Sequence, residues 1–215
     1  MNKEEKFVIT ISRQFGTGGH EIGAELARRL NVKLLDKQIL NEMARKYNIV
    51  EEAVERIESR NPLWRDDFTQ FYRSYMAQAE YNGQEHDQTS RQLFDAQAEV
   101  IKKIAAEESC VIIGRCGFHI FRNHPNALKI FIHADVDCRK KRIGRKYDIS
   151  ESDAAAMIVD NDYSRELYTK TFTGSEWQDA RNYDVSLNVK QFGVNGAVDF
   201  LMLRIFPLRT IVLKV

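Results

Sequence analysis

Short apolar runs alternate with stretches of helical periodicity along most of this chain, and this alternation restricts the fold more than any other feature of the sequence. Strands separated by helices form βαβ units, whose strands run parallel. We therefore expect an α/β fold with a parallel sheet of about five strands. Strands are predicted at residues 7–11, 33–35, 110–113, 128–132 and 184–189, and helices at 21–30, 37–58, from about 135 onward and at 194–203.

The charge balance and the cysteine count narrow the class of protein. The 215 residues carry 32 Lys and Arg against 31 Asp and Glu, a net charge of +1. Nucleic-acid binders and membrane-surface binders have a marked basic excess, so this balance argues against both. No signal-peptide core and no membrane-spanning run stands out. Cys110, Cys116 and Cys138 fit neither a disulfide framework nor a zinc site. We expect one cytoplasmic domain over residues 1–215.

A glycine-rich turn separates the first predicted strand from the first predicted helix. Glycine lets the backbone curl, and the free N–H groups at the start of a helix point toward a phosphate. The other interpretation is a plain tight turn that lets the helix and the strand pack closely. Because a strand and a helix flank the turn on the correct sides, we favour phosphate binding. The predicted phosphate-binding residues are Gly16, Thr17, Gly18, Gly19, His20 and Glu21.

The turn departs from the Walker A sequence G-x-x-x-x-G-K-[ST]. Laid over residues 13–20, that template finds Arg13, Gly18, Gly19 and His20 at its fixed positions, and only Gly18 matches. The lysine that reaches the β- and γ-phosphates and the hydroxyl that holds Mg²⁺ are both replaced. Another cation must neutralise the phosphates if chemistry occurs here. Arg13 is the best candidate within the turn, because a guanidinium is always protonated.

Several motifs follow one another along the chain, and together they resemble a known family. They are Ile9 to Gly23, Leu35-Asp36-Lys37, Ile113-Gly114-Arg115, a basic helix after His133-Ala134, Asp162-x-x-Arg165, Phe172-Thr173-Gly174, Trp177 and Asn182-Tyr183-Asp184. This set resembles the cytidylate kinase-like family, a bacterial branch of the P-loop nucleoside monophosphate kinases with an altered Walker A loop. The resemblance covers most of the chain, from residue 7 to about residue 189. His20 departs from it, since such proteins more often carry arginine there.

The resemblance implies both an architecture and an activity. The architecture is a P-loop NTPase-type three-layer sandwich with a helical acceptor-binding insertion at about residues 37–105 and a basic lid at about 135–170. The activity is transfer of the γ-phosphoryl group of ATP, with Mg²⁺, to a nucleoside monophosphate, CMP first. Two alternatives stay open, a nucleotide- or phosphate-binding module without catalysis and a kinase for another small acceptor. The missing lysine favours the binding module, and the set of arginines disfavours it.

A basic run follows the fourth predicted strand, and six of the eight residues from 139 to 146 are Lys or Arg. Arg139, Arg142 and either Arg145 or Lys146 fall on one helical face, and Arg145 is taken as the third lid arginine. A run of this kind is often a solvated face or a local nucleic-acid patch. The resemblance favours a lid that closes over the triphosphate. Arg139 and Arg142 then join Arg13 as catalytic candidates, because phosphoryl transfer mainly needs positioned positive charge.

Four residues are candidates for binding the acceptor. Arg115 follows a strand, where its planar fork can grip a phosphate or form a surface ion pair. Asp162 and Arg165 lie three residues apart on a predicted helix and can form an ordinary salt bridge. The resemblance implies instead that Asp162 positions Arg165 on the acceptor phosphate. Asp36 either caps the next helix or faces the acceptor nucleotide or its bound metal.

Two segments outside these motifs suggest contacts between subunits. Trp64, Phe68, Phe71, Tyr72 and Tyr75 form a stripe at helical spacing, which favours a core or an oligomer contact over the wall of a substrate pocket. Residues 210–213 are rich in β-formers and indicate an edge strand or a subunit contact. A homo-oligomer is therefore an open alternative. The histidine spacings fit no metal-ligand motif, so we expect no protein-held metal centre. The expected partner is a small-molecule nucleotide.

Overall fold

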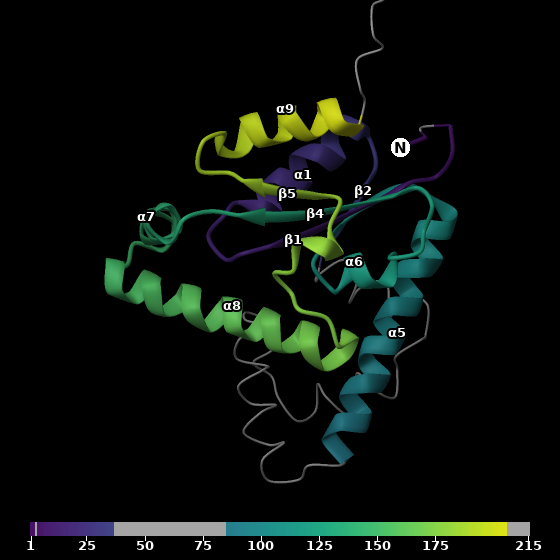
Figure 1. Ribbon diagram of the computed structural model, residues 1–215, viewed down its shortest axis with the longest axis horizontal. Coiled ribbons are helices and arrows are strands. Elements are labelled where there is room, and N and C mark those ends of the chain that lie inside the picture. Colours follow the sequence, from purple (N-terminus) through teal and green to yellow (C-terminus); the bar gives the residue numbers. More distant parts are fainter. Residues whose placement is uncertain (3, 37–84, 206–215) are drawn as a thin grey trace, which may run out of the picture.

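The computed structural model describes residues 1–2, 4–36 and 85–205 and arranges them around one sheet (Figure 1). The strands are β1 (Val8–Arg13), β2 (Lys33–Leu35), β3 (Cys110–Ile113), β4 (Ala127–His133) and β5 (Val185–Asn188). The helices are α1 (Gly19–Leu30), α5 (Glu85–Glu107), α6 (Gly117–Ile120), α7 (Val136–Tyr147), α8 (Glu151–Thr173), the 3-10 helix η2 (Ala180–Asn182) and α9 (Gly193–Ile205).

The sheet is parallel throughout, with the strand order β2-β3-β1-β4-β5. β1 is its centre, since Ile11 pairs with Ile113 of β3 on one side and with Ile130 of β4 on the other. The strands β2 and β3 lie on one side of β1. The strands β4 and β5, which come later in the chain, lie on its other side. In such sheets ligands bind outside the carboxyl ends of the strands, where the direction of winding reverses. The segments that follow β1 and β3 therefore form the place where a ligand is expected.

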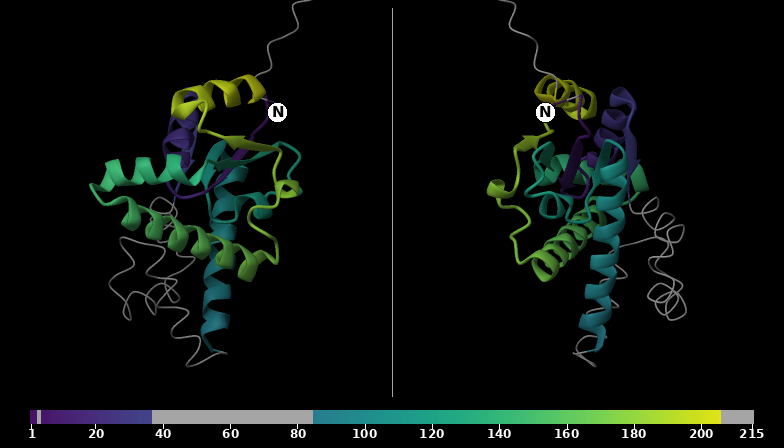
Figure 2. Two further views of the ribbon diagram at one scale, coloured as in Figure 1. Left: turned by 60° about the vertical axis from the view of Figure 1, so that its left-hand side comes forward. Right: turned by 90° about the vertical axis from the view of Figure 1, so that its right-hand side faces the viewer.

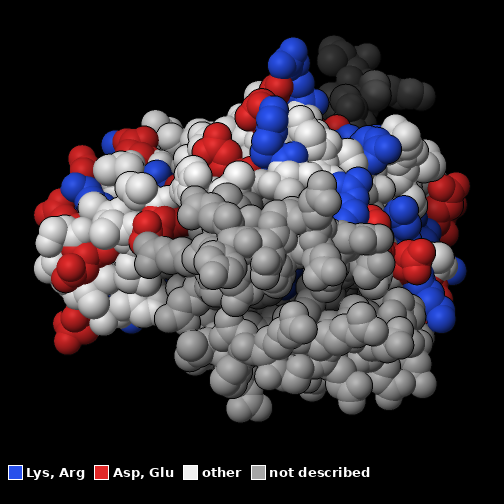
Figure 3. All heavy atoms as spheres, turned by 90° about the horizontal axis from the view of Figure 1, so that it is seen from below, with Lys and Arg blue, Asp and Glu red and all other residues white. Residues whose placement is uncertain are grey.

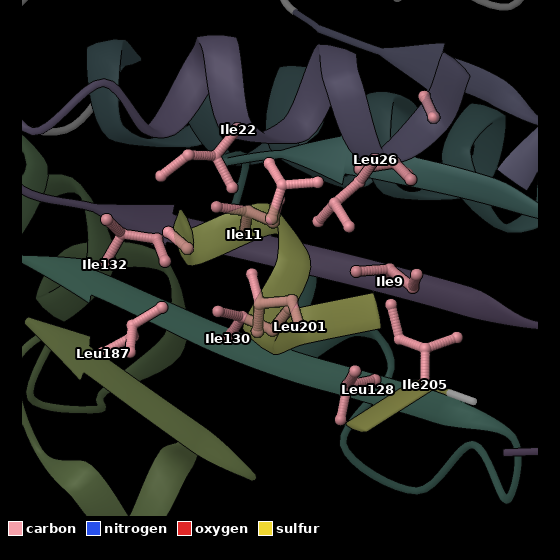
Figure 4. Close-up of a cluster of buried hydrophobic side chains, with 14 of the residues drawn as sticks. Ile9, Ile11, Ile22, Leu26, Leu128, Ile130, Ile132, Leu187, Leu201 and Ile205 are labelled. Atoms are coloured by element: carbon pink, nitrogen blue, oxygen red, sulfur yellow. The ribbon is translucent and has the colours of Figure 1, made fainter. Parts of the chain in front are cut away.

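One face of the sheet packs against α1 and α9. Alternate residues of a strand point to the same face, and Ile9 and Ile11 of β1 lie in one buried cluster with Ile22 of α1 and Leu201 of α9 (Figure 4). All four side chains are fully buried. Burying a side chain of this size stabilises the fold by about 1.5–3 kcal/mol, so this layer holds α1, and with it the glycine-rich turn, against the sheet.

The other face of the sheet is covered by α5, with α6 and α8 on the same side (Figure 1). Val8 and Ile112 of the sheet pack there against Ile101 and Ile104 of α5. In both views of Figure 2, α5 reaches beyond the sheet on the side away from α9. Helices on both faces complete the three layers of the expected sandwich.

The predicted parallel five-stranded sheet is confirmed. The strands at residues 33–35 and 110–113 have the predicted bounds, whereas β1 and β4 run on to Arg13 and His133. The sequence analysis did not predict the short helix α6. The helix predicted at residues 37–58, the aromatic stripe and residues 210–213 lie outside the described residues. The predicted acceptor-binding insertion also lies outside the described residues up to residue 84. Helix α5 occupies the rest of that insertion.

The described surface carries both signs of charge. On the face seen in Figure 3, Lys and Arg side chains lie among those of Asp and Glu, which matches the net charge of +1. Among the helices of the described residues, none has both the length and the apolar character needed to cross a membrane.

The contact between α1 and β3 generates a stability prediction at Gly23. A Cβ atom there would lie 2.2 Å from the Cδ1 atom of Ile113 and 3.2 Å from that of Ile11. Both isoleucines are buried, so neither methyl group can move without displacing its neighbours. We expect Gly23→Ala to lower the free energy of unfolding by about 1–3 kcal/mol, as overpacking does. Urea denaturation measures this value.

Gly196→Ala in α9 is the matched control. Its Cβ atom would lie 3.3 Å from the Cβ atom of Phe192, a half-exposed residue that can yield. Alanine is favoured over glycine inside a helix by about 0.5–1 kcal/mol, so no loss is expected. Equal unfolding midpoints for Gly23→Ala and the unmodified protein would contradict the tight α1–β3 contact.

Candidate active site

The glycine-rich turn after β1 is a loop of tight backbone turns that leads into α1. Gly16 and Gly18 have φ angles of 82° and 80°, in the left-handed region that favours glycine. Gly18 is also the N-cap residue of α1, and no side chain caps that helix end. The first N–H groups of a helix lack partners within it and attract anions. The local structure therefore provides the features of an anion site.

Three hydrogen bonds hold this loop, one within the loop and one each to β4 and α8. The N–H of Gln14 donates to the carbonyl of Ile132 in β4 at 2.9 Å. The hydroxyl of Thr17 donates to the carbonyl of Gln14 at 2.8 Å. The N–H of Phe15 donates to Oδ1 of Asp162 in α8 at 2.7 Å. Thr17, a predicted phosphate-binding residue, thus uses its side chain to shape the loop.

Asp162 joins the loop to both helices of the predicted lid. Besides the Phe15 N–H, it accepts a bond from Nη1 of Arg139 in α7 at 2.5 Å and one from Nη1 of Arg165 in α8 at 3.4 Å. Arg139 also donates to the carbonyl of Phe15, and Arg165 to that of Arg13, each at 3.3 Å. The Arg139 side chain is 7% exposed. Its guanidinium is therefore committed to holding the loop.

Helix α7 lies directly against the glycine-rich turn and places Arg142 beside it. A Cβ atom on Gly18 would lie 2.9 Å from Nη2 of Arg142, so the guanidinium lies directly against the turn, and the φ of 80° at Gly18 favours glycine there. Arg142 donates to Oε1 of Glu21 at 3.0 Å. Burial raises the pKa of Glu21, but its own backbone hydrogen bond and its contact with Arg142 outweigh burial and lower it. Arg145 is exposed on the same helix. The charge of Lys146, and not that of Arg145, contributes to the lowered pKa of Glu21.

The segment after β3 is a strained turn that presents Arg115. Gly114, Arg115 and Cys116 have φ angles of 72°, 54° and 52°. Non-glycine residues rarely adopt this conformation, which costs about 1–3 kcal/mol each and is concentrated at functional sites. Arg115 bonds to the side chain of Tyr168 in α8, a partly buried tyrosine whose pKa is raised to about 12 mainly by desolvation.

Arg13, at the carboxyl end of β1, extends from the glycine-rich turn toward this strained turn. Its Cβ and Cγ atoms would lie 2.7 Å from a Cβ atom on Gly19, and its Nη1 atom 2.5 Å from one on Gly114. A lysine at residue 19, as the Walker template requires, would overlap the Arg13 side chain. Burial, then the charges of Arg165 and Arg115, lower the pKa of Arg13 to about 9, so it is still charged at neutral pH.

Asp36, the first residue after β2, lies at the same end of the sheet. Its Oδ2 atom is 3.3 Å from Nε2 of His20, and its charge raises the pKa of Arg13. The start of α1 and the ends of β1, β2 and β3 thus meet in one place. Within the described residues, no group of three His, Cys, Asp or Glu side chains is placed to hold a metal ion.

The structure brings most of the predicted site residues together at the carboxyl edge of the sheet. Arg145 is the exception, since α7 directs Arg139 and Arg142 toward the loop and leaves Arg145 exposed. The sequence analysis missed Gln14 and Tyr168. Gln14 lies inside the matched Ile9 to Gly23 segment and offered a signal, because a polar residue directly after a buried strand is a candidate loop anchor. Tyr168 gave no such signal, since only the crossing of α8 over β3 brings it to Arg115.

Solved structures share this fold. An uncharacterized protein from Eubacterium ventriosum is 28% identical with a TM-score of 0.67, covering 94% of this chain and 98% of its own. A shikimate kinase from Acinetobacter baumannii, solved in complex with shikimate, has a TM-score of 0.50 at 10% identity and covers 94% of each chain. At that identity the likeness concerns the fold alone.

Three archaeal cytidylate kinases are similar in sequence. The protein from Methanosarcina acetivorans is 29% identical over 103 residues, 47% of this chain and 57% of the relative. The protein from Methanoculleus marisnigri is 28% identical over 52% of this chain and 60% of its own length, so the chain spans less than two thirds of these two curated relatives. The protein from Sulfolobus acidocaldarius is 23% identical over 90% of this chain and 91% of its own.

A family model agrees with these relatives and extends over most of the molecule. It covers residues 8–191, which include β1, the glycine-rich turn, the Arg115 turn, α7, α8 and β5. Every part of the candidate site among the described residues therefore lies inside the match. The chain belongs to the cytidylate kinase-like family.

Proposed function

We propose that this protein is a nucleotide kinase that transfers the γ-phosphoryl group of ATP to a nucleoside monophosphate, with CMP as the first candidate. One observation carries the proposal. The uncapped N-terminus of α1, with Arg142 against Gly18, lies beside a strained turn that presents Arg115. Phosphoryl transfer asks a protein for positioned charge and little covalent chemistry. A phosphate-binding turn next to a second set of arginines meets that requirement.

The donor side is formed by residues 16–21 and α7. The N–H groups at the start of α1 would receive the phosphates of ATP, as helix N-termini do. Arg142 is the cation proposed for the donor side, since its guanidinium lies against Gly18. Mg²⁺ often takes its ligands from substrate phosphates and water, which suits a site where His20 replaces the Walker hydroxyl. The ion would bridge the β- and γ-phosphates.

The acceptor side is formed by the ends of β2 and β3 and by α8. Arg115 and Arg165 would bind the acceptor phosphate, and Asp36 would face the nucleotide or the metal at the same edge of the sheet. The archaeal relatives named cytidylate kinase place CMP first among acceptors. A binding module without catalysis is the second candidate, because Gly19 stands where the Walker template has its lysine.

An ADP-release assay tests the proposal directly. The protein is incubated with MgATP and, in turn, with CMP, UMP, AMP or GMP, and ADP is measured with coupling enzymes. We expect acceptor-dependent release that is fastest with CMP. Binding of ATP without transfer to any monophosphate would select the binding module, and transfer only to an acceptor without phosphate would select another kinase class.

Replacing Arg142 tests the donor side. We expect Arg142→Ala to lower the affinity for ATP and the turnover by about tenfold or more, since one charge-assisted contact is worth about 1.5–3 kcal/mol. Steady-state kinetics with varied ATP measure the change. Lys141→Ala is the matched control, because Lys141 is exposed on the same helix. If both variants behave like the unmodified protein, the donor cation comes from elsewhere.

Replacing Asp162 tests the link between the lid helices and the loop. Asp162→Asn leaves the buried Arg139 without its charged partner, and breaking such a pair costs about 3–5 kcal/mol. We expect a loss of free energy of unfolding near the lower end of that range in urea denaturation. Glu166→Gln, an exposed carboxylate on the same helix, should change stability by less than about 0.5 kcal/mol. Equal stabilities would show that Asp162 does not anchor the loop.

A further inference from the structure

The direction in which the Arg13 side chain points indicates how the acceptor substrate is bound. Arg13 belongs to the glycine-rich segment by sequence, and that position favours a role on the donor phosphates. Its guanidinium nevertheless lies at the end of β3. The stem passes over Gly19, with Cβ and Cγ 2.7 Å from where a Cβ on Gly19 would be, and Nη1 lies 2.5 Å from the corresponding position on Gly114.

Only glycine at both positions leaves room for this path. Gly19 is at the start of α1, and Gly114 has a φ of 72° in the turn that presents Arg115. Because both residues lack a side chain, Gly19 and Gly114 leave the space through which the Arg13 side chain passes. The backbone adds a further contact, since the carbonyl of Arg13 accepts a bond from Nη1 of Arg165 at 3.3 Å. Arg13, the last residue of β1, therefore contacts both the end of β3 and helix α8.

The charges that act on Arg13 are those of the acceptor side. Arg165 and Arg115 repel it, whereas Asp162 and Asp36 attract it. Asp162 is shared by the Phe15 N–H, Arg139 and Arg165, so its single negative charge faces several guanidinium groups at once. Three guanidinium groups gathered from β1, β3 and α8 favour a ligand with more than one negative charge, because each guanidinium can donate to a separate oxygen.

We propose that Arg13 binds the phosphate group of the acceptor together with Arg115 and Arg165, and that this triad restricts the acceptor to phosphate monoesters. The inference rests on the proposed function, because only a kinase has an acceptor substrate. Binding of the phosphate group by the three arginines can nevertheless be measured without turnover. Arg13 then selects the substrate that receives the phosphoryl group, and Arg142 remains the cation of the donor side.

Calorimetric titration of Arg13→Met with CMP, cytidine and ADP tests the assignment. Methionine keeps an unbranched stem over Gly19 and removes the charge. We expect the affinity for CMP to fall by about tenfold or more, while the affinities for ADP and cytidine change by less than about threefold. Arg13→Lys, which keeps the charge without the fork, should give an intermediate loss. Arg122→Met, an exposed arginine before β4, is the control, and thermal unfolding verifies that each variant is folded.

Each outcome decides the matter. A fall in ADP affinity with unchanged CMP affinity would place Arg13 on the donor side and overturn the proposal, as would unchanged affinities for both. If the unmodified protein binds neither CMP nor inorganic phosphate at millimolar concentration, the triad is not a phosphate site. Phosphoryl transfer to cytidine at the rate seen with CMP would overturn the triad's selectivity but leave the kinase standing. CMP binding that depends on Arg13 without any ADP release would leave the triad standing and remove the kinase.

Discussion

The carboxylate of Asp162 is the interaction on which the geometry of the site depends. It accepts the N–H of Phe15 in the loop and the guanidinium groups of Arg139 in α7 and Arg165 in α8. A backbone loop rich in glycine has many accessible conformations, and anchoring it in one of them lowers the entropy that phosphate binding must overcome. The same contacts set α7 against the loop, where Arg142 lies beside Gly18. One side chain thus determines both the shape of the turn and the position of the cation next to it.

The site also shows how a P-loop can differ from the Walker sequence without losing its positive charge. Arg13 and a lysine at residue 19 exclude each other, because the Arg13 stem occupies the space that a Cβ on Gly19 needs. The chain therefore carries its cations on neighbouring elements, with Arg142 on α7, Arg115 after β3 and Arg165 on α8. Such an arrangement requires α7 and α8 to be packed against the loop, and the hydrogen bonds of Asp162 and the apolar contacts among Phe15, Ile143 and Ile158 hold them there.

The fold could be predicted from the sequence to a large extent. Buried strands such as residues 110–113 are continuous apolar runs between helical stretches, and that pattern depends only on local periodicity. The glycine-rich turn was predictable for the same reason, since its strand, glycines and helix are adjacent in the chain. Most candidate site residues were found because residues directly after parallel strands converge at one edge. The spacing left Arg145 and Lys146 as alternatives beside Arg139 and Arg142, because spacing defines a helical face only to within one residue, and in the structure it is the charge of Lys146 that acts on Glu21.

The sequence by itself determined the α/β class, the position of the glycine-rich turn and the set of arginines available to it, because each of these follows from residues close together in the chain. Only the tertiary structure decided what each arginine touches. Arg139 is committed to Asp162 although it belongs to a basic run, and Arg13 reaches β3 although it begins the loop. These directions depend on contacts between residues that are not neighbours in the chain, 23 positions apart for Arg139 and Asp162 and more than 100 for Arg13 and Gly114. The packing of α7, α8 and β3 around β1 creates those contacts, and local sequence carries no record of them.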